Sequence, residues 1–556
     1  MQPNLYQRTC RWNPDQSPEG KRWVSAHRVD ARSSDGRRMS GHGHTEYRSI
    51  CLVALPALLL FFWVVHPCSG GEKLRKIIDV GSRKQLFIDE MFIESSSGVR
   101  LTMNPPSQTL EPVLVADQPW EDSIHAYSSV IKEGGKIRIW YSVSPKPPAE
   151  LCVAYAESTD GIHFVKPKMN LVEINGSQAN NIVLGGKIGG SAVWIDPKAP
   201  PNQRYKTQAK IYPSGKLHMH ASPDGYHWTF FAALQVGHKD TQNIVFWDDA
   251  VNRYALYGRK KIYYEGSEKD HIANRMVKRL ESDDLVSWDN EVVVMKADDV
   301  DLATYDTGTP RPPVDYYGAA VFKYPDVHGA YIMLAQAFWH WKQRPVEQRR
   351  DESGSKELPK HERLAPSALD VRLAVSRDGK KFKRAGGRKP FLGLGREGSF
   401  SSRFVWAMPN PIRMGDELWI YYMGTNRDHD GFIDPASSEH LSGISRAVMR
   451  LDGFVSADAD YSGGEIVTPL IRFKGKTLEL NLDTSGGGSV FVELLDENDR
   501  PIEGFTRADA TPLCGNSVRM PVSWGQNQDV SKLAGRPIKM RLVMRDCKLY
   551  AFQFAK

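Results

Sequence analysis

The sequence has few cysteines and only one long apolar run, and each scarcity excludes a class of protein. Its 556 residues include 6 cysteines, and none stands in a Cys-x-x-Cys pair or at Cys/His ligand spacing. A structural zinc site is therefore not expected. Because no second run approaches membrane-spanning length, a multi-span membrane protein is excluded. The composition, 41% hydrophobic and 25% charged, is that of a globular protein.

Charge of one sign is also scarce once the first residues are set aside. The formal net charge is +7, but residues 1–48 alone hold nine Lys/Arg against five Asp/Glu. The remaining chain is nearly neutral and has no basic stripe, so we expect no nucleic-acid partner. It also has no P-loop, dinucleotide fingerprint, nucleophile elbow or metal-ligand cluster, so we expect no cofactor and no metal.

The apolar run at residues 50–65 predicts where the protein goes. As a helix it would reach about 24 Å, short of the roughly 30 Å of a bilayer core. Residues 1–48 are expected to be a basic, disordered leader, with Met39 as the hypothetical true start, and residues 49–71 a cleavable export signal. A single membrane anchor and a buried core helix are the alternatives. The protein is expected to be extracytoplasmic, secreted or periplasmic, and to touch a membrane only through this segment.

A short hairpin motif recurs five times. It consists of a strand that ends in Ser or a small residue, then Asp-Gly, then an aromatic residue; the third copy has Leu in place of Gly, and the fifth copy is degenerate. The repeated aspartates are Asp160, Asp224, Asp284, Asp378 and Asp452. An aromatic-rich alternating run, typical of a β-strand, precedes each copy. Asp-Gly between two strands is a hairpin turn, so we interpret Asp160, Asp224 and Asp378 as structural.

These repeats predict an all-β chain. Each copy is a small antiparallel meander that cannot bury both faces alone, so we expect a five-bladed β-propeller over residues 80–464. The segment Gln85–Ile93 is expected to close the ring, and 342–366 to be an inserted loop. After the repeats end, alternating strands predict a C-terminal β-sandwich over 465–556, where Cys514 and Cys547 either pair or remain thiols. A plain β-sandwich with many hairpins is the alternative fold.

Acidic residues stand just before the first strand in four of the five repeats. Inner strands of a propeller converge on its axis, so these acids are the catalytic candidates. They are Asp122, Asp240, Asp306 and Glu397. Glycoside cleavage needs one carboxylic acid to protonate the leaving oxygen and one carboxylate to attack the sugar or activate water. The alternative is that they only cap turns.

Residues beside these acids are the predicted substrate contacts. Trp120 and His125 would supply a stacking platform and a polar contact, and the arginines would hold a carboxylate or a substrate hydroxyl. The predicted set is Trp120, Glu121, His125, Gln242, Asn243, Arg259, Arg311 and Arg403.

The Ser-x-Asp-Gly-x-x-Trp/Phe hairpins, the aromatic second strands and the trailing sandwich resemble the five-bladed propeller glycosidases of the β-fructosidase and arabinosidase superfamily (glycoside hydrolase families 32 and 43). The resemblance covers roughly residues 80–556. It implies that Asp122 is nucleophile or base, that Asp240 orients and that Glu397 is the acid, with Asp306 in reserve. The signature Trp-Met-Asn-Asp-Pro-Asn-Gly is absent and the second repeat carries no acid, so the resemblance implies a diverged member.

The functional expectation is an exported, monomeric glycoside hydrolase that cleaves a poly- or oligosaccharide. A non-catalytic carbohydrate-binding propeller is the first alternative, since it would keep the aromatic residues without needing a carboxylate pair. A sialidase-like enzyme is the second, although that class has six blades, an arginine triad and a tyrosine nucleophile.

Overall fold

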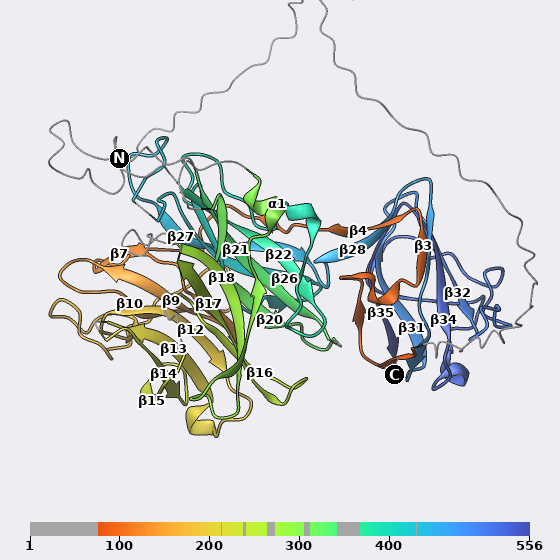
Figure 1. Cartoon of the computed structure of the whole chain (residues 1–556), viewed down its shortest axis with the longest axis horizontal. Coiled ribbons are helices and arrows are strands. Elements are labelled where there is room, and N and C mark those ends of the chain that lie inside the picture. Colours follow the sequence, from red (N-terminus) through yellow and green to blue (C-terminus); the bar gives the residue numbers. More distant parts are fainter. Residues whose placement is uncertain are drawn as a thin grey trace, which may run out of the picture. The chain divides into compact units, whose positions relative to one another are not determined.

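The computed structural model describes an all-β protein, as predicted (Figure 1). The one α-helix in the described part is the short α1 (Asp299–Leu302), and no helix there is long and apolar enough to span a membrane. The predicted leader and export signal lie outside the described residues, as does the predicted loop at 342–366. The described ranges are 76–212, 214–236, 241–263, 273–304, 312–327, 329–341, 367–429 and 431–556.

Three antiparallel meanders come first, and each is a separate sheet. The first consists of β7 (Glu121–Ile124), β8 (Ser129–Glu133), β9 (Lys136–Pro145), β10 (Cys152–Ser158) and β11 (Ile182–Leu184). The second consists of β12 (Ile188–Ile195), β13 (Tyr205–Ile211), β14 (Lys216–Ser222) and β15 (Thr229–Ala233). The third consists of β16 (Ile244–Asp248), β17 (Arg253–Tyr263), β18 (Ala273–Ser282) and β19 (Asp289–Met295).

The fourth and fifth meanders share a sheet of ten strands, because β22 and β24 meet in parallel at Leu369 and Phe404. The fourth consists of β20 (Val314–Lys323), β21 (Tyr331–His340), β22 (Ser367–Ser376) and β23 (Lys383–Arg384). The fifth consists of β24 (Phe404–Ala407), β25 (Ile412–Met414), β26 (Glu417–Thr425) and β27 (Ser442–Arg450). The free edge of β27 pairs with β5 (Ser107–Gln108) and β6 (Leu114–Val115), which precede the first meander.

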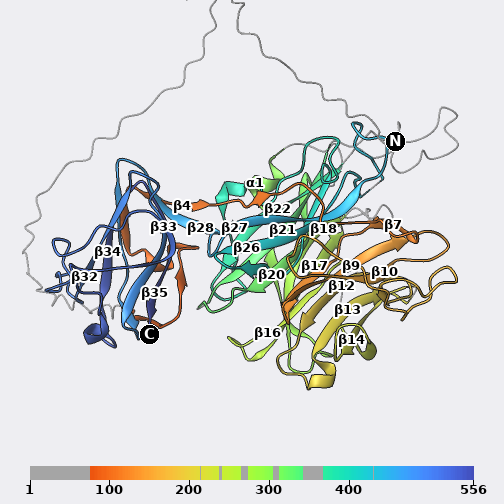
Figure 2. The ribbon, with the colours of Figure 1, turned by 180° about the vertical axis from the view of Figure 1, so that it is seen from behind.

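The remaining strands, from both ends of the described chain, form the sheets of a second region (Figures 1 and 2). From the N-terminal side they are β1 (Ile78–Gly81), β2 (Gln85–Leu86), β3 (Ser95–Ser97) and β4 (Val99–Met103). From the C-terminal side they are β28 (Val455–Ala459), β29 (Gly464–Val467), β30 (Ile471–Phe473), β31 (Thr477–Asp483), β32 (Ser489–Leu495), β33 (Asn516–Pro521), β34 (Lys539–Arg545) and β35 (Cys547–Ala555). Short 3-10 turns occur at Glu90–Phe92, Pro201–Gln203, Gly386–Arg388 and Ser531–Leu533.

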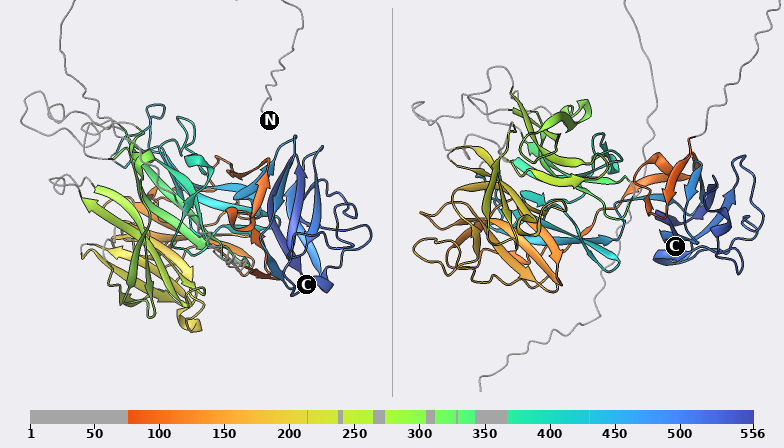
Figure 3. Two further views of the ribbon diagram at one scale, coloured as in Figure 1. Left: turned by 45° about the vertical axis from the view of Figure 1, so that its right-hand side comes forward. Right: turned by 90° about the horizontal axis from the view of Figure 1, so that it is seen from below.

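The prediction that Gln85–Ile93 closes the ring of repeats is wrong. Gln85 and Leu86 pair with β35 in the second region, and the strands added to β27 are β5 and β6. The physical reason is burial: the Phe87 and Phe92 rings pack with Phe552 at 5.8 and 5.2 Å in the core of the second region. Strand pairing therefore draws residues 78–103 to the C-terminal strands (Figure 3), whereas the sequence predicted that the repeated region begins at residue 80.

Apolar clusters lie between consecutive meanders, and another joins the fifth meander to the first. The interfaces pair the first with the second, the second with the third, the third with the fourth and the fourth with the fifth. The contact between fifth and first buries the aromatic residues Tyr141, Trp406 and Tyr421. A cavity of about 480 Å³ is lined by Val130 of β8, Val193 of β12, Val245 of β16, Pro325 after β20 and Ile412 of β25.

The repeated aspartates hold the turns at the outer hairpins, as predicted. In four copies a Ser hydroxyl donates to Oδ1 of the Asp two residues later, at 2.8 to 3.1 Å. The same Oδ1 accepts two backbone N–H groups from the residues two and three positions further on. These four copies are Ser158/Asp160, Ser222/Asp224, Ser282/Asp284 and Ser376/Asp378.

The fifth copy differs from the other four. Asp452 is buried, and its carboxylate accepts hydrogen bonds from Lys84 at 2.8 Å, from Tyr324 at 2.9 Å and from Asn481 at 2.9 Å. Lys84 and Asn481 belong to the second region, so this copy of the motif ties the fourth and fifth meanders to it.

Candidate functional site

The starts of the inner strands meet at one place, and Gln242 is the residue that joins most of them. Its Nε2 donates to the carbonyl oxygens of Ser128 and Ser191, both at 2.9 Å, and its Oε1 accepts from Trp406 Nε1 at 3.3 Å. Thr241 Oγ1 donates to the carbonyl of Tyr317 at 3.5 Å. These contacts connect all the meanders, and we call the side chains around them the central cluster. Its members are Asp122, His125, Tyr127, Arg259, Arg275, Asp315, Tyr317, His340, Trp406, Arg427, His429 and His440.

Aromatic rings form the apolar part of the central cluster. The Trp406 ring meets Tyr127 edge-on at 5.1 Å and Tyr317 at 5.5 Å, measured between centroids. The hydroxyl of Tyr317 lies 3.2 Å from His429 Nε2. Trp406 and Tyr317 are buried, so the half-buried Tyr127 is the ring of this group on which a sugar can stack.

A buried ionic group lies against the same aromatic rings. Asp315 is fully buried, and its Oδ2 accepts from Arg275 Nη1 at 2.8 Å and lies 3.2 Å from His340 Nε2. Burial alone would raise the pKa of Asp315, but Arg275 and His340 outweigh it and lower the pKa to about 2. The guanidinium carbons of Arg259 and Arg275 lie 4.7 and 5.1 Å from the Tyr317 ring centroid.

Asp122 and two histidines form the accessible part of the cluster. Asp122 and His125 are exposed, yet protein atoms crowd most of the surroundings of the His125 ring. That burial, together with the nearby His440 and Arg427, lowers the pKa of His125, and Asp122 opposes the effect. The pKa of His440 is lowered by burial and by Arg427, again against Asp122, and its Nε2 lies 3.0 Å from Thr425 Oγ1. The site therefore holds neutral imidazoles beside a carboxylate.

The two predicted catalytic acids that the structure describes lie in different surroundings. Asp122 lies in the central cluster with His125, and its carboxylate accepts from Ser123 Oγ at 3.3 Å. Glu397 is exposed in the turn before β24, and within the described residues its side chain has no hydrogen bond or ion pair. Asp240 and Asp306 lie outside the described residues, as does the predicted contact Arg311.

Glu121, predicted to contact substrate, is instead fully engaged inside the protein. Its carboxylate pairs with Lys166 at 2.6 Å and accepts from Tyr141 at 2.7 Å. It also accepts the backbone N–H groups of Asp117 and Gln118 at 3.0 and 3.1 Å. With four donors on its carboxylate, Glu121 fixes the segment that carries Asp122.

Gln242 and Asn243 were predicted to bind substrate, and both are buried and bonded to backbone. Asn243 donates to the carbonyl of Thr241 at 3.0 Å, so the pair holds the start of β16 in place. Trp120 is half-buried and packs beside the first meander. Arg259 is buried against Tyr317, and Arg403 lies 3.7 Å from Asp434 and 5.7 Å from the Trp341 ring.

Several members of the central cluster were not predicted. Asp315 was overlooked because it is the second residue of β20, whereas the prediction considered only residues ahead of each strand. Arg427 and His429 follow directly on the aromatic strand at 417–425, in the run Asn426-Arg-Asp-His429, and this density of polar residues after a strand was an available signal. Nothing local marked Tyr317 or His440.

Metal and disulfide chemistry find little support in the described chain. There, no group of three or more His, Cys, Asp or Glu side chains is placed to hold a metal ion. The described cysteines Cys152, Cys514 and Cys547 are free thiols, so the disulfide alternative for the last two is wrong. Cys547 is buried in a β-strand while Cys514 is exposed in a loop.

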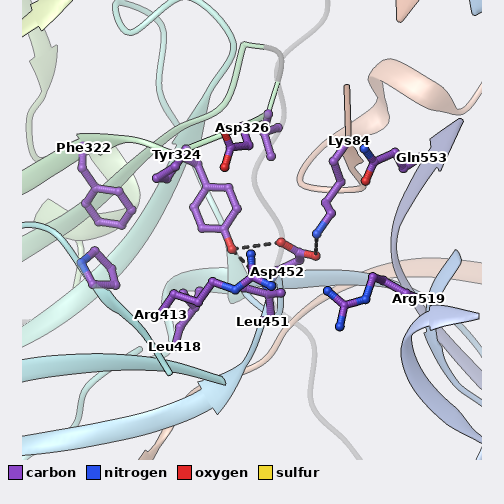
Figure 4. Close-up of a pocket in the computed structure, with 13 residues that line it drawn as sticks. Lys84, Phe322, Tyr324, Asp326, Arg413, Leu418, Leu451, Asp452, Arg519 and Gln553 are labelled. Atoms are coloured by element: carbon purple, nitrogen blue, oxygen red, sulfur yellow. Dashed lines mark hydrogen bonds and ion pairs between the residues drawn. The ribbon is translucent and has the colours of Figure 1, made fainter. Parts of the chain in front are cut away.

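A separate cavity of about 320 Å³ lies where the fourth and fifth meanders face the second region (Figure 4). Phe322, Leu418 and Leu451 form its apolar wall, and the bonded group of Lys84, Asp452 and Tyr324 lies at its centre. It shares no residue with the central cluster. The Lys84–Asp452 pair spans the two regions, so this cavity belongs to the joint between them.

No protein-family model matches the sequence, and no curated protein matches it. Among solved structures, an N-acetylgalactosamine deacetylase from F. plautii is similar at 13% identity and a TM-score of 0.40, over 64% of this chain and 96% of that one. A thermostable family-43 glycoside hydrolase is similar at 14% identity and 0.39, over 61% and 95%. A β-1,2-mannobiose phosphorylase from Listeria innocua is similar at 14% and 0.39, over 63% and 98%.

At these TM-scores the likeness says nothing about activity. The function has to come from the residues of this chain.

Proposed function

We propose that this protein is an exported glycoside hydrolase built on a five-bladed β-propeller with an accessory β-sandwich. The ring of apolar interfaces, in which the fifth meander packs on the first, supports the propeller. So does the cavity that β8, β12, β16, β25 and the loop after β20 line together. The sandwich would comprise residues 465–556 together with the strands of 78–103 and 455–459.

The observation that carries the proposal is the placement of Asp122. It is an exposed carboxylate beside His125 and His440, next to a group of aromatic rings, where the ends of all the meanders meet. A carboxylate in that position can attack an anomeric carbon or activate water, and neutral imidazoles can donate hydrogen bonds to sugar hydroxyls. Tyr127, half-buried beside the Trp406 ring, would supply the apolar face that a pyranose needs.

A second carboxyl group has to protonate the leaving oxygen. Glu397 is assigned this role, with Asp240 orienting the sugar and Asp306 in reserve. The assignment follows the resemblance to the family 32 and 43 enzymes. The sandwich is an accessory module, and the enzyme works as a monomer without a cofactor.

The decisive experiment is turnover of a panel of neutral and charged oligosaccharides by the full-length protein. Asp122→Asn and Glu397→Gln are each expected to lower kcat/KM about 10²- to 10⁴-fold, the usual contribution of a general acid or base. Asp299→Asn, exposed in α1, and Glu503→Gln, exposed in the second region, are matched controls that should leave turnover unchanged.

Each result has a distinct meaning. Full activity of Asp122→Asn would remove Asp122 from the mechanism, and full activity of Glu397→Gln would leave Asp240 or Asp306 as the acid. If the parent protein binds oligosaccharides and turns none over, the protein is a carbohydrate-binding propeller without catalysis. The observation that keeps this alternative open is that, in the described part of the chain, no hydrogen bond or ion pair holds the exposed Glu397 side chain in place as an acid.

A further inference from the structure

The loop after β26 carries an arginine whose guanidinium takes part in none of the contacts of the central cluster. Arg427 is exposed, and in the described part of the chain its guanidinium makes no hydrogen bond or ion pair. Its main chain is nevertheless fixed: its N–H donates to Thr425 Oγ1 at 3.1 Å, and the residue forms a β-bridge with Ile433. Fixing the backbone reduces the entropy that the side chain has to lose when it binds a ligand.

Buried polar side chains hold the loop that carries Arg427. Asn426, Asp428 and Asp434 are all at most 5% exposed. Asn426 donates to the carbonyl of Glu439 and accepts from the N–H of Leu441, both at 2.8 Å. Asp428 accepts from the N–H groups of Ser367 and Phe432, and Asp434 from those of Gly398 and Ala436. The loop is therefore a built structure that determines where Arg427 and His440 lie.

Arg427 acts electrostatically on the two histidines of the site, and most of the described acids nearby are already paired. Arg427 is one of the groups that lower the pKa of both His125 and His440, after burial itself. Of the described acids nearby, Asp315 is paired with Arg275, while Asp434 is bonded to backbone N–H groups and faces Arg403. Asp122 remains as the accessible acid, and as the proposed catalytic carboxylate it would face the sugar itself.

An exposed guanidinium on a fixed main chain matches one ligand chemistry. Its planar fork of N–H donors pairs with a carboxylate or a sulfate through two parallel hydrogen bonds. Neutral His125 and His440 can each add one N–H donor to the same anion. Neutral sugar hydroxyls would not need an arginine whose charge costs free energy to desolvate.

We propose that the glycan that this site receives carries an anionic substituent, a uronate carboxylate or a sulfate ester, and that Arg427 binds it. This inference rests on the proposed glycosidase function, because it names the class of sugar for the same site. Arg427 would act as a specificity residue, and Asp122 would lie toward the bond that is cleaved.

The test uses matched pairs of oligosaccharides that differ only in charge. One pair is an oligogalacturonate and its methyl ester; the other is a carrageenan oligosaccharide and its desulfated form. Binding is measured by calorimetry and turnover by product release, in about 150 mM salt, where the Debye length of about 8 Å suppresses unspecific attraction. The proteins are the full-length parent, Arg427→Gln, Arg427→Lys and Arg536→Gln, the last an exposed arginine of the second region.

We expect the parent to prefer the charged member of one pair about tenfold or more, and that pair tells uronate from sulfate. Arg427→Gln should abolish the preference, Arg427→Lys should keep part of it, and Arg536→Gln should keep all of it. Because the Arg427 guanidinium has no partner in the described chain, unchanged melting temperatures should accompany these results.

Two further outcomes overturn the inference in distinguishable ways. If the parent binds and cleaves charged and neutral sugars equally, or if Arg427→Gln retains the preference, Arg427 does not bind an anionic substituent. Turnover of neutral sugars in that case would still support the glycosidase function. If none of the four sugars nor any member of the neutral panel is bound or cleaved, the proposed function fails and this inference fails with it.

Discussion

The outer hairpins and the central cluster are built in opposite ways. Each of four outer turns repeats the same Ser-to-Asp hydrogen bond and the same two backbone contacts to the Asp carboxylate. At the centre the contacts are not repeated: Gln242 of the third meander bonds to carbonyl groups of the first and second and accepts from Trp406 of the fifth. Arg275 of the third meander pairs instead with Asp315 of the fourth.

The outer turns also share a way of docking on the neighbouring meander. Tyr421 OH donates to the carbonyl of Gly161 at 2.8 Å, and Trp140 Nε1 donates to that of Gly225 at 2.7 Å. Tyr257 OH donates to Gly379 at 2.7 Å. These three motifs thus stabilise the assembly twice, once within their own turn and once across an interface. What is repeated in this chain builds the fold, and what is not repeated is the place to look for function.

The largest predicted effect tests the buried charge at the centre. Asp315→Ala leaves Arg275 and His340 without their shared carboxylate, and removing one partner of a buried pair costs about 3–5 kcal/mol. We expect the free energy of unfolding in urea to fall by that amount. Asp299→Ala, an exposed acid in α1, should change it by less than about 0.5 kcal/mol. Equal stability of the two variants would show that the ionic group at the centre is not a structural element.

The next effect tests the docking of an outer turn. Gly225 has a φ of +84°, and a Cβ placed there would lie 2.6 Å from the Trp140 ring. Gly225→Ala therefore combines a left-handed backbone with overpacking, and we expect a loss of about 2–4 kcal/mol. Gly215 has a φ of +65° with nothing within 4 Å, so Gly215→Ala should cost only about 1–2 kcal/mol. Thermal unfolding of both variants measures the difference, which isolates the cross-interface contact from backbone strain.

The same contrast explains what could be predicted from the sequence. The turn roles of Asp160, Asp224 and Asp378 were predictable because a hairpin is a local structure whose residues are adjacent in the chain. The pairing of Gln85 with Phe552 was not, since strands so far apart carry no mark of their partner. Long-range pairing therefore caused the main error in the fold.

The candidate site follows the same rule. Position near a strand start predicted Asp122 and His125, and the structure brings them together with His440 and Arg427. The same rule also selected Glu121 and Gln242, which are buried and hold neighbouring segments in place through hydrogen bonds. Sequence position indicates which residues are near the centre, but the direction of a side chain depends on contacts between meanders that no single repeat encodes.

A smaller effect is expected when a single turn loses its hydroxyl. Ser282→Ala removes the bond to Asp284 Oδ1 and the acceptance of the Asp284 and Leu285 N–H groups. Loss of a side-chain cap of this kind costs about 0.5–2 kcal/mol. In the fifth motif Arg450 stands at the position of this serine, so that motif offers no matching Ser→Ala variant. Chemical denaturation should show a reduced midpoint with an unchanged slope, and glycan binding should not change, because the turn lies away from the central cluster.

The smallest predicted effect concerns the stability of the fold at low pH. Burial would raise the pKa of Asp224, but hydrogen bonds from the His227 backbone and ring, the Tyr226 backbone and Ser222 lower it to about 2. Because the folded pKa lies below the ordinary value of about 3.9, this carboxylate stabilises the fold fully above that value, and its contribution disappears as the pH falls toward 2. The side chain is partly exposed, so solvent screening keeps the effect small. In urea unfolding at pH 5 and pH 3, Asp224→Asn should therefore lose less stability on acidification than the parent does. An identical loss in both proteins would show that the Asp224 turn contributes nothing to acid sensitivity.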